Sequence, residues 1–396
     1  MSTILQLTPH DPLIARDGRP FGAGQGNRMR GLPWPLPSVV AGSFRTALVK
    51  ATPGLDFSGD MPERLLKIAV AGVFPVHAGQ LYLAAPNDCA WDDKTEKVHR
   101  VQPIQLQAGE GVDFPDAAQG IMPVRLTAEQ ATEDFKAKNP PEWWPLSKYQ
   151  EWLTSSAKQY PSDWFSPEFL SSPRQAMRDH VALDAGRGAA AEGNIFATAN
   201  LHVTHLPRFG TKPDDKKLKF GERFTQVELS VRVEAGESGL GVSNLSLWHP
   251  LGGERRLVHW QQCQRAVTGW ECPQAIREAL ASTSHVRMIL ATPAIFAGGW
   301  KPGWLNEQLE GTPPGCAVKL KLVGVSNGRW KAVSGWSLAP PRGPKAIRRM
   351  VPAGSVYFFT CEPGAAAKLA DFWLLPVSDD DQERRDGFGL ALWGTW

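Results

Sequence analysis

The groups best suited to chemistry in this sequence are basic side chains, which gather in two stretches that contain no Asp or Glu. These stretches are residues 18–55 and 311–361. The net charge of the whole chain is only +3, so the balancing acids lie elsewhere, notably at residues 379–383. Such separation creates basic surface on a nearly neutral protein, which is the electrostatic footprint of a polyanion such as a nucleic acid. The alternative is that like charges only solvate one face.

Glycines in the first basic stretch could bring main-chain amides close to a phosphate. Gly22, Gly24 and Gly26 are each two residues apart. This spacing is neither the G-x-G-x-x-G of a dinucleotide site nor a P-loop, because no Gly-Lys-Ser/Thr follows it. Since glycine has no Cβ, the loop favours close approach to a polyanion backbone over nucleotide hydrolysis.

One serine lies in a hydrolase-like motif. Gly324-Val-Ser326-Asn-Gly328 fits the G-x-S-x-G pattern. A nucleophile elbow needs a strand before the serine and a helix after it. Here a strand-like run follows instead, and Asn327-Gly328 is typical of a hairpin turn. We therefore do not expect Ser326 to be catalytic.

Three histidines have the spacing of possible catalytic or metal-binding groups. His202 and His205 could ligate a metal, but the nearby sequence offers no Cys or paired carboxylate to complete three or four ligands. His10, beside Asp11, could be the general base of an RNA-cleaving enzyme. Because the sequence places no second catalytic group near it, we predict no catalytic residue, no metal site and no cofactor.

Tryptophan is unusually frequent, with sixteen residues in the chain. Most are expected in cores and domain junctions, because indole is the largest apolar side chain. A minority could stack on unpaired bases, as aromatic side chains do in single-stranded RNA sites. The candidates that lie in the second half of the chain near its basic stretch are Trp300, Trp304, Trp336 and Trp393.

The elements that must position these groups predict an α+β fold. In the first unit the pattern predicts a strand at 4–7, an amphipathic helix at 39–50, strand segments within 67–83, and strands at 227–233 and 257–262. In the second unit it predicts strands at 286–290 and 318–322, a hairpin at Asn327-Gly328, a strand at 356–359, a short helix at 365–373 and a final strand near 390–394. The order of elements in the second unit is close to a split βαβ, ferredoxin-like plan.

Residues 110–180 differ from both units and predict a helical, Trp-rich insertion. Capping-box patterns begin at Thr127 and Ser147. We expect its tryptophans to form a small core of their own or a docking surface; they are Trp143, Trp144, Trp152 and Trp164. The predicted domains are therefore 1–270, which contains this insertion, and 280–396, which ends in a glycine-rich loop.

Length and composition narrow the class of protein. A chain of 396 residues predicts two or three domains. No run approaches the ~18 apolar residues of a membrane span, and the first residues lack the pattern of a secretory signal. The five cysteines are scattered and form no CxxC pair. We therefore expect reduced thiols and a cytoplasmic protein without a membrane partner.

Several of these segments together resemble the RAMP-superfamily CRISPR subunits. Residues 7–21, LTPHDPLIARDGRPF, with the glycine-rich loop after them, are similar to the family's N-terminal signature, and residues 32–48 continue it. Four further segments resemble the third subunit of the type III-B (Cmr) effector complex in particular. They are residues 180–196, residues 252–257, residues 342–359 and the glycine-rich ending.

This resemblance implies two ferredoxin-like, RRM-related domains and a non-catalytic subunit that holds the repeat-derived 5′ tag of a guide RNA. It also implies docking against the large polymerase-cyclase subunit and the first backbone subunit of the complex. The residues that we expect to bind RNA are Arg16, Arg19, Arg28, Arg45, Arg255, Arg256, Lys345, Arg348, Arg349, Gly387 and Gly389. Asp17 is expected to pair with a neighbouring arginine and to shape the first loop.

Two alternatives remain open from the sequence. The same superfamily includes guide-processing endoribonucleases that use a His-centred acid/base site and no metal, and these enzymes also have a C-terminal glycine-rich loop. The other alternative is a scaffold that contacts only proteins.

Overall fold

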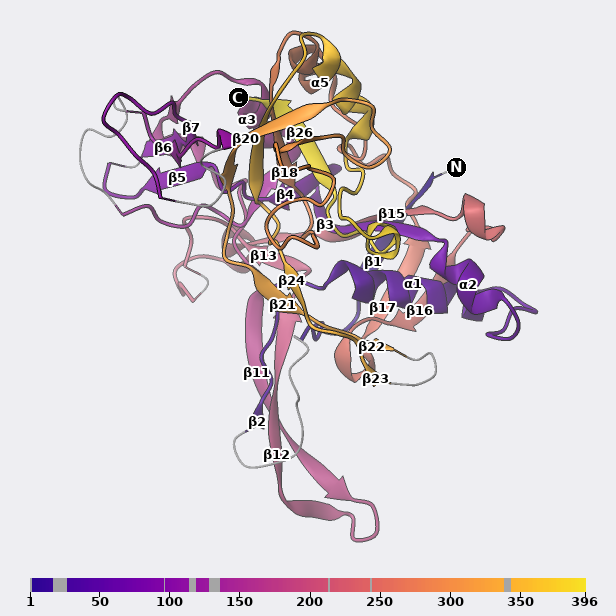
Figure 1. The fold of residues 1–396 in the computed structure, drawn as a ribbon. Coiled ribbons are helices and arrows are strands. Elements are labelled where there is room, and N and C mark those ends of the chain that lie inside the picture. The colour runs from indigo at the N-terminus through magenta and orange to yellow at the C-terminus, as the bar shows by residue number, and fades with distance from the viewer. Residues whose placement is uncertain are drawn as a thin grey trace.

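Two large antiparallel sheets lie at the centre of the computed structural model (Figure 1). The structure describes residues 2–16, 27–95, 97–113, 119–127, 136–212, 214–242, 244–337 and 343–396. Strands outnumber helices in this part of the chain, and nearly all paired strands are antiparallel. This mixture agrees with the predicted α+β class.

The first sheet has seven strands, in the spatial order β16-β17-β1-β15-β3-β4-β9. Their bounds are β1 (Ser2–Pro9), β3 (Ala69–His77), β4 (Gln80–Ala84), β9 (Trp143–Pro145), β15 (Glu228–Glu234), β16 (Ser246–Pro250) and β17 (Leu257–Gln262). Alternate residues such as Leu5, Leu229 and Val231 point to one face and pack in a core with Phe44 of α1 (Pro37–Ala51). A proline opens this helix at its first position, where the missing N–H costs nothing.

The second sheet has five strands, in the spatial order β19-β20-β25-β18-β26. Their bounds are β18 (His285–Leu290), β19 (Glu310–Gly311), β20 (Leu320–Ser326), β25 (Val356–Cys361) and β26 (Ala391–Thr395). Helix α5 (Gln274–Ala281) and the 3-10 helix η5 (Ala365–Phe372) pack on each other and on β26. The 365–373 segment is thus helical as predicted, but it has 3-10 geometry.

Both sheets contain four neighbouring strands in the same spatial order. Numbered along the chain, the fourth strand lies beside the first, the first beside the third, and the third beside the second. These sets are β17-β1-β15-β3 and β26-β18-β25-β20, and every neighbouring pair is antiparallel.

The hairpin prediction at Asn327-Gly328 is wrong. The far side of β20 is already occupied, because β19 pairs with it and the Met122 N–H donates to the Val323 carbonyl. The chain instead leaves the sheet and forms a basic ribbon, described over residues 327–337 and 343–350. In this ribbon β21 (Lys331–Val333) pairs with β24 (Arg348–Met350), and β22 (Trp336–Ser337) pairs with β23 (Gly343–Pro344).

A second long hairpin projects from the body of the molecule (Figure 1). It consists of β11 (Arg174–Asp184) and β12 (Ala189–His202), and we call it the arm. The short strand β2 (Asn27–Arg28) pairs with β12 in parallel. The remaining elements are α2 (Met61–Leu66), β5 (Cys89–Asp92), β6 (Lys97–Arg100), β7 (Gln102–Pro103), β8 (Val124–Arg125), α3 (Leu146–Thr154), β10 (Gln159–Tyr160), η2 (Ser162–Trp164), β13 (His205–Pro207), α4 (Phe220–Arg223), β14 (Phe224–Gln226), η3 (Gly236–Ser238), η4 (Gly253–Arg255) and α6 (Asp381–Arg385).

The tryptophans of the predicted insertion do not form a separate core. Trp144 and Trp152 are fully buried and belong to one large cluster that also contains Met288 and Trp393 of the second sheet. Their segment adds β9 to the edge of the first sheet, and α3 packs against α5 and β26. These side chains therefore join the two sheets.

A buried ion pair lies within this junction. Arg287 of β18 contacts Asp88, which follows β4, at 2.5 Å, and both side chains are 0% exposed. Trp152 Nε1 donates to the same carboxylate at 2.9 Å, and the Trp152 carbonyl accepts from Arg287 and Arg100. Burial, followed by the nearby charge of Arg287, lowers the pKa of Arg100 to about 10.

We expect Asp88→Ala to lower the free energy of unfolding by about 3–5 kcal/mol, because it leaves the buried Arg287 guanidinium without its counter-charge. Chemical denaturation of the full chain measures this change. The matched control is Asp371→Ala, which breaks an exposed pair with Arg277 and should cost less than about 1 kcal/mol. Equal losses in the two variants would contradict a special role for the buried pair.

Candidate nucleic-acid interface

The arm carries a cationic face. The register places Arg174 opposite His202 and Arg178 opposite Thr198. Because alternate residues of a strand point to the same side of the sheet, these four side chains lie on one face of the arm. His180 lies on the same face and stacks on Phe196 at 5.1 Å. Burial, followed by the charges of Arg178 and Arg174, lowers the pKa of His202. This arrangement suits a phosphate backbone, which would offset the clustered positive charge.

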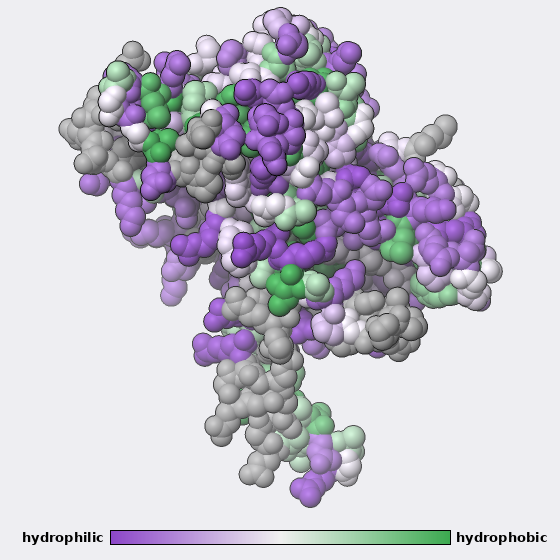
Figure 2. Space-filling view, in the orientation of Figure 1, coloured by the Kyte–Doolittle hydropathy of each residue, from purple (hydrophilic) through white to green (hydrophobic). Residues whose placement is uncertain are grey.

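The opposite face of the arm is apolar toward its far end. Met177, Val181 and Ile195 on this face are about half exposed or more, and the exposed Asp179 lies between the first two. Leu183, beyond a register shift after Val181, is also exposed. Hydrophobic residues appear beside hydrophilic ones at this end of the arm in Figure 2. A projecting apolar surface of this kind is typical of an interaction site.

Arg256 extends the cationic face of the arm from a neighbouring turn. Its Nη2 donates to the Asn200 Oδ1 of β12 at 3.2 Å. The turn lies tightly against the start of the chain, since a Cβ on Gly252 would lie 2.4 Å from the Ile14 carbonyl oxygen. Arg255, the adjacent predicted RNA contact, is exposed.

Arg16 lies near the base of the arm, and Arg28 lies about midway along it, beside Ala197. Both side chains are exposed. The backbone of Arg16 forms an isolated antiparallel β-bridge with Gly31, and Arg28 lies on β2 beside β12. Met29 anchors this segment by packing on Ala199 of the arm. Arg19, Asp17 and the predicted glycine loop lie outside the described residues.

The basic ribbon presents three of the predicted cations to solvent. Lys345, Arg348 and Arg349 are exposed, whereas Val333 and Met350 hold the ribbon against the body. Arg348 forms an ion pair with Glu383 of α6, so it is already partly neutralised. Arg349 instead lies over the ring of Trp330, 5.1 Å from its centroid. The ribbon's assignment to RNA stays a prediction, with Lys345 and Arg349 as its strongest members.

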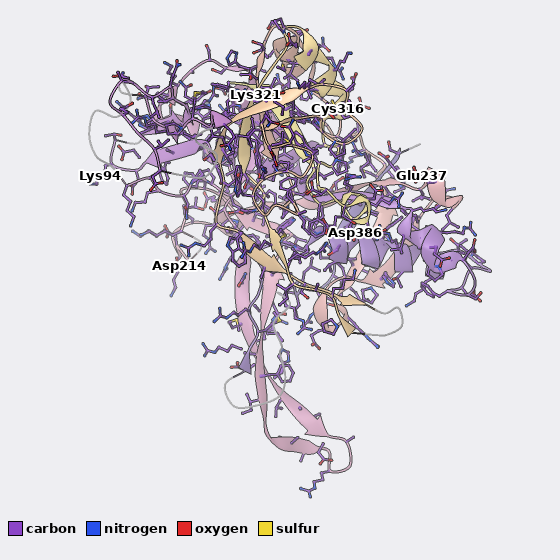
Figure 3. All side chains as sticks on the ribbon, in the orientation of Figure 1. Lys94, Asp214, Glu237, Cys316, Lys321 and Asp386 are labelled. Atoms are coloured by element: carbon purple, nitrogen blue, oxygen red, sulfur yellow. The ribbon has the colours of Figure 1, made fainter. Side chains whose placement is uncertain are left out.

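Arg45 has a different role from the one predicted. It is 7% exposed, and its Nη1 contacts the carboxylate of Asp386 at 2.6 Å (Asp386 is labelled in Figure 3). Its Nη2 donates to the Ile68 carbonyl at 2.7 Å. The guanidinium thus joins α1 to the C-terminal segment after α6, and we reassign Arg45 from RNA contact to that junction.

Gly387 and Gly389 also require reassignment. Both are buried with positive φ, and their amides donate to Arg384 and Pro293 carbonyls within the chain. A Cβ on Gly387 would lie 2.4 Å from the Val70 carbonyl oxygen of β3. Gly387 therefore allows the C-terminal segment to pack on the first sheet, and Gly389 allows it to pack on Ser378. The amides of both glycines are already bonded within the chain and are not available to a phosphate.

The side chains weighed for catalysis have other contacts. The Ser326 hydroxyl donates to the Asn87 carbonyl at 2.8 Å. The His10 ring meets Trp248 edge-on, at 5.8 Å between centroids. The described residues contain no group of three His, Cys, Asp or Glu side chains that could hold a metal ion.

The described helices include none that is long and apolar enough to cross a membrane.

The tryptophans weighed for base stacking are mostly packed inside. Trp393 is fully buried, and the indoles of Trp393 and Trp304 donate to the Phe372 and Val377 carbonyls. Trp300 is partly buried, and the side chain of Trp336 lies outside the described residues. Among the described side chains of the ribbon, Trp330 is exposed; the sequence did not single it out, although it lies between Arg329 and Lys331.

A model of the family described as CRISPR-associated protein (Cas_Cmr3) matches residues 5–396. The chain belongs to this family. It is therefore a Cmr-type CRISPR subunit, and the resemblance drawn from the sequence is confirmed. No curated protein matches the Cas_Cmr3 chain.

Solved structures similar to this Cas_Cmr3 chain come from type III complexes. One, from "Type III-B Cmr-beta bound to cognate target RNA", has a TM-score of 0.47 and 13% identity, and the match covers 98% of this chain and 96% of the other. A second, of the same complex with AMPPnP, has a TM-score of 0.44 and 12% identity over 90% and 86%. A chain of a type III-A Csm3-Csm4 subcomplex has a TM-score of 0.33 and 8% identity over 100% and 99%.

We expect Gly389→Ala to lower the melting temperature of the Cas_Cmr3 chain and to weaken RNA binding only as far as the folded fraction falls. The added Cβ would lie 2.7 Å from Ser378 Oγ, at a φ of +78°. Gly54→Ala is the control, because Gly54 has a φ of +81° with nothing within 4 Å. In both variants the left-handed backbone of the new alanine should cost about 1–2 kcal/mol of stability. Gly389→Ala should lose more stability than Gly54→Ala, because its Cβ also meets Ser378. Normal melting with lost RNA binding would restore the RNA-contact role.

Proposed function

We propose that this chain is a non-catalytic subunit of a type III-B CRISPR effector complex that holds the repeat-derived 5′ tag of the guide RNA. We propose further that it docks the large polymerase-cyclase subunit to the first backbone subunit, and that it works in the cytoplasm. Membership of the Cas_Cmr3 family supports the complex, and the exposed cationic surfaces of the chain support the RNA.

The observation that carries the RNA role is the meeting of two basic elements at one segment. Gln175, at the base of the arm, donates to the Leu32 carbonyl at 3.3 Å. The Leu32 side chain packs with Val333 and Met350 of the basic ribbon. The arm and the ribbon therefore begin from a shared base at Leu32, although Gln175 itself lies on the arm face opposite Arg174 and Arg178. An RNA strand that passes this base has cations to follow on both elements.

The apolar face of the arm supports the docking role. Its exposed side chains lie on the face opposite Arg174 and Arg178, so the arm separates an RNA-like surface from a protein-like one. A protein partner that covers Val181 and Ile195 would bury apolar surface without competing for the cations on the other face.

We also propose that each large sheet is the centre of a ferredoxin-like unit. The strand order described above, with α1 between β1 and β3, is the order that two split βαβ halves produce. In the second unit an irregular segment of residues 291–319 replaces the first helix, apart from β19.

A salt titration tests the RNA surface. Each phosphate contact on a single strand should contribute about 0.7 to the slope of log affinity against log salt. Lys345→Ala with Arg349→Ala should therefore lower the slope for repeat RNA by about 1.4, and Arg174→Ala with Arg178→Ala should do the same. Arg277→Ala, which removes a partly exposed arginine of α5 that pairs with Asp371, is the control and should leave the slope unchanged. Unchanged slopes in both folded double variants would contradict an RNA role for these surfaces.

A cleavage assay tests the non-catalytic role against its main alternative, a metal-independent guide-processing endoribonuclease. The full chain, incubated with repeat-containing RNA and magnesium, manganese or a chelator, should bind the RNA and leave it intact. Specific cleavage that disappears in His10→Ala would contradict the proposal and favour the enzyme. Assembly of the complex without any RNA contact by this chain would favour a scaffold that contacts only proteins.

A further inference from the structure

The basic ribbon exposes a tryptophan on its solvent side. Ala332 lies opposite Arg349, so Trp330, two residues before Ala332, falls on the same face of the ribbon. Val333 and Met350 lie on the opposite face and are 3% exposed. The body of the protein thus fixes which way the ribbon faces, and Trp330 lies on the side away from the core.

Trp330 differs from the tryptophans that build the core. Its side chain is 53% exposed, and the Arg349 guanidinium lies over the indole. This cation–π contact holds the indole and places a second flat, cationic group beside it. Ile347, on the same side of the ribbon, is 75% exposed.

The charge around Trp330 favours a nucleic acid over a protein as its ligand. Residues 311–361 contain no acid, and Arg329 precedes the indole along the chain, whereas Lys331 lies opposite Met350 on the other face of the ribbon. An exposed aromatic ring among cations is the composition with which proteins bind unpaired nucleotides, because any base can stack on the ring while the cations meet the phosphates. Protein interfaces also use Trp and Arg, but their cores are depleted of charge.

We propose that Trp330, held by Arg349, is a stacking site for an unpaired base of single-stranded RNA. This proposal rests on the RNA-binding role proposed above and adds a non-ionic contact to it. Stacking requires a free base face, so the site discriminates single-stranded from double-stranded RNA, which the phosphate contacts alone do not.

Trp248 provides a matched control. It is 54% exposed, almost the same as Trp330, but it lies on β16 and its ring partners are His10 and His259. Replacing either tryptophan removes an equally exposed indole. A difference between the two variants therefore reports the surroundings of the ring.

The experiment measures binding of the full chain to a short fluorescent oligoadenylate and to a blunt RNA duplex of the same length, across a series of salt concentrations. Trp330→Ala should weaken oligoadenylate binding by about 5- to 150-fold, the usual range for loss of one stacked base. The salt slope should stay unchanged, because no ion pair is removed, and duplex binding should change far less. Trp330→Phe should retain most of the affinity, and Trp248→Ala should bind as the parent does.

The outcomes separate the two proposals. If Trp330→Ala binds oligoadenylate as tightly as the parent while Lys345→Ala with Arg349→Ala binds weakly, the stacking site is overturned and the RNA-binding role stands. Equal losses in Trp330→Ala and Trp248→Ala, or equal losses on single strand and duplex, also overturn the stacking site. If the parent chain binds neither oligoadenylate nor repeat RNA, both proposals fail. Melting curves of each variant confirm that it is folded.

Discussion

Arg287 and Asp88 form a fully buried ion pair at the place where the two sheets meet. Removing two charges from water costs several kcal/mol for each ion, and their attraction offsets this cost only with good geometry and further hydrogen bonds. Trp152 supplies a hydrogen-bond donor for the carboxylate and an acceptor for the guanidinium, because its indole donates to Asp88 and its carbonyl accepts from Arg287. Since either charge alone would be strongly unfavourable there, the pair specifies one arrangement of β18 against the Trp-rich segment. The arm follows the Trp-rich segment and the ribbon follows β20 of the second sheet, so their relative position depends on this junction.

Burial sorts the arginines of this chain into two roles. Arg45, Arg100 and Arg287 are buried and satisfy carbonyls and carboxylates within the protein. Arg174, Arg178 and Arg349 lie on projecting hairpins, where water still solvates them and a phosphate can reach them. The chemistry of the side chain is the same in both groups. What differs is whether the local strand or helix points it toward the core or toward solvent.

The strands and the helix with a clear hydrophobic period were predictable from the sequence. When one face of such an element is buried, apolar residues recur at every second position in a strand and at every third or fourth position in a helix. The strand at 257–262 and the helix over 39–50 are found almost as predicted. Pairing was not predictable in the same way: Asn327-Gly328 is typical of a hairpin, yet the outer edge of β20 is already occupied by β19. Gly387 could not be placed from sequence either, since a tight turn and a close contact with β3 both require glycine. The cationic face of the arm was not predicted from the sequence, because its residues are alternate positions on two different strands. Only the pairing register shows that they lie on the same face.

Photo-crosslinking in the assembled type III-B complex tests the central claim most directly. A guide RNA that carries 4-thiouridine in its repeat-derived 5′ tag is crosslinked, and the peptides of this chain that carry the RNA are mapped. The account predicts crosslinks from the tag to the arm, residues 174–202, and to the described strands of the basic ribbon, residues 327–337 and 343–350. Crosslinks from the tag only to other subunits, or on this chain only to the buried C-terminal segment around Gly387 and Gly389, would contradict it.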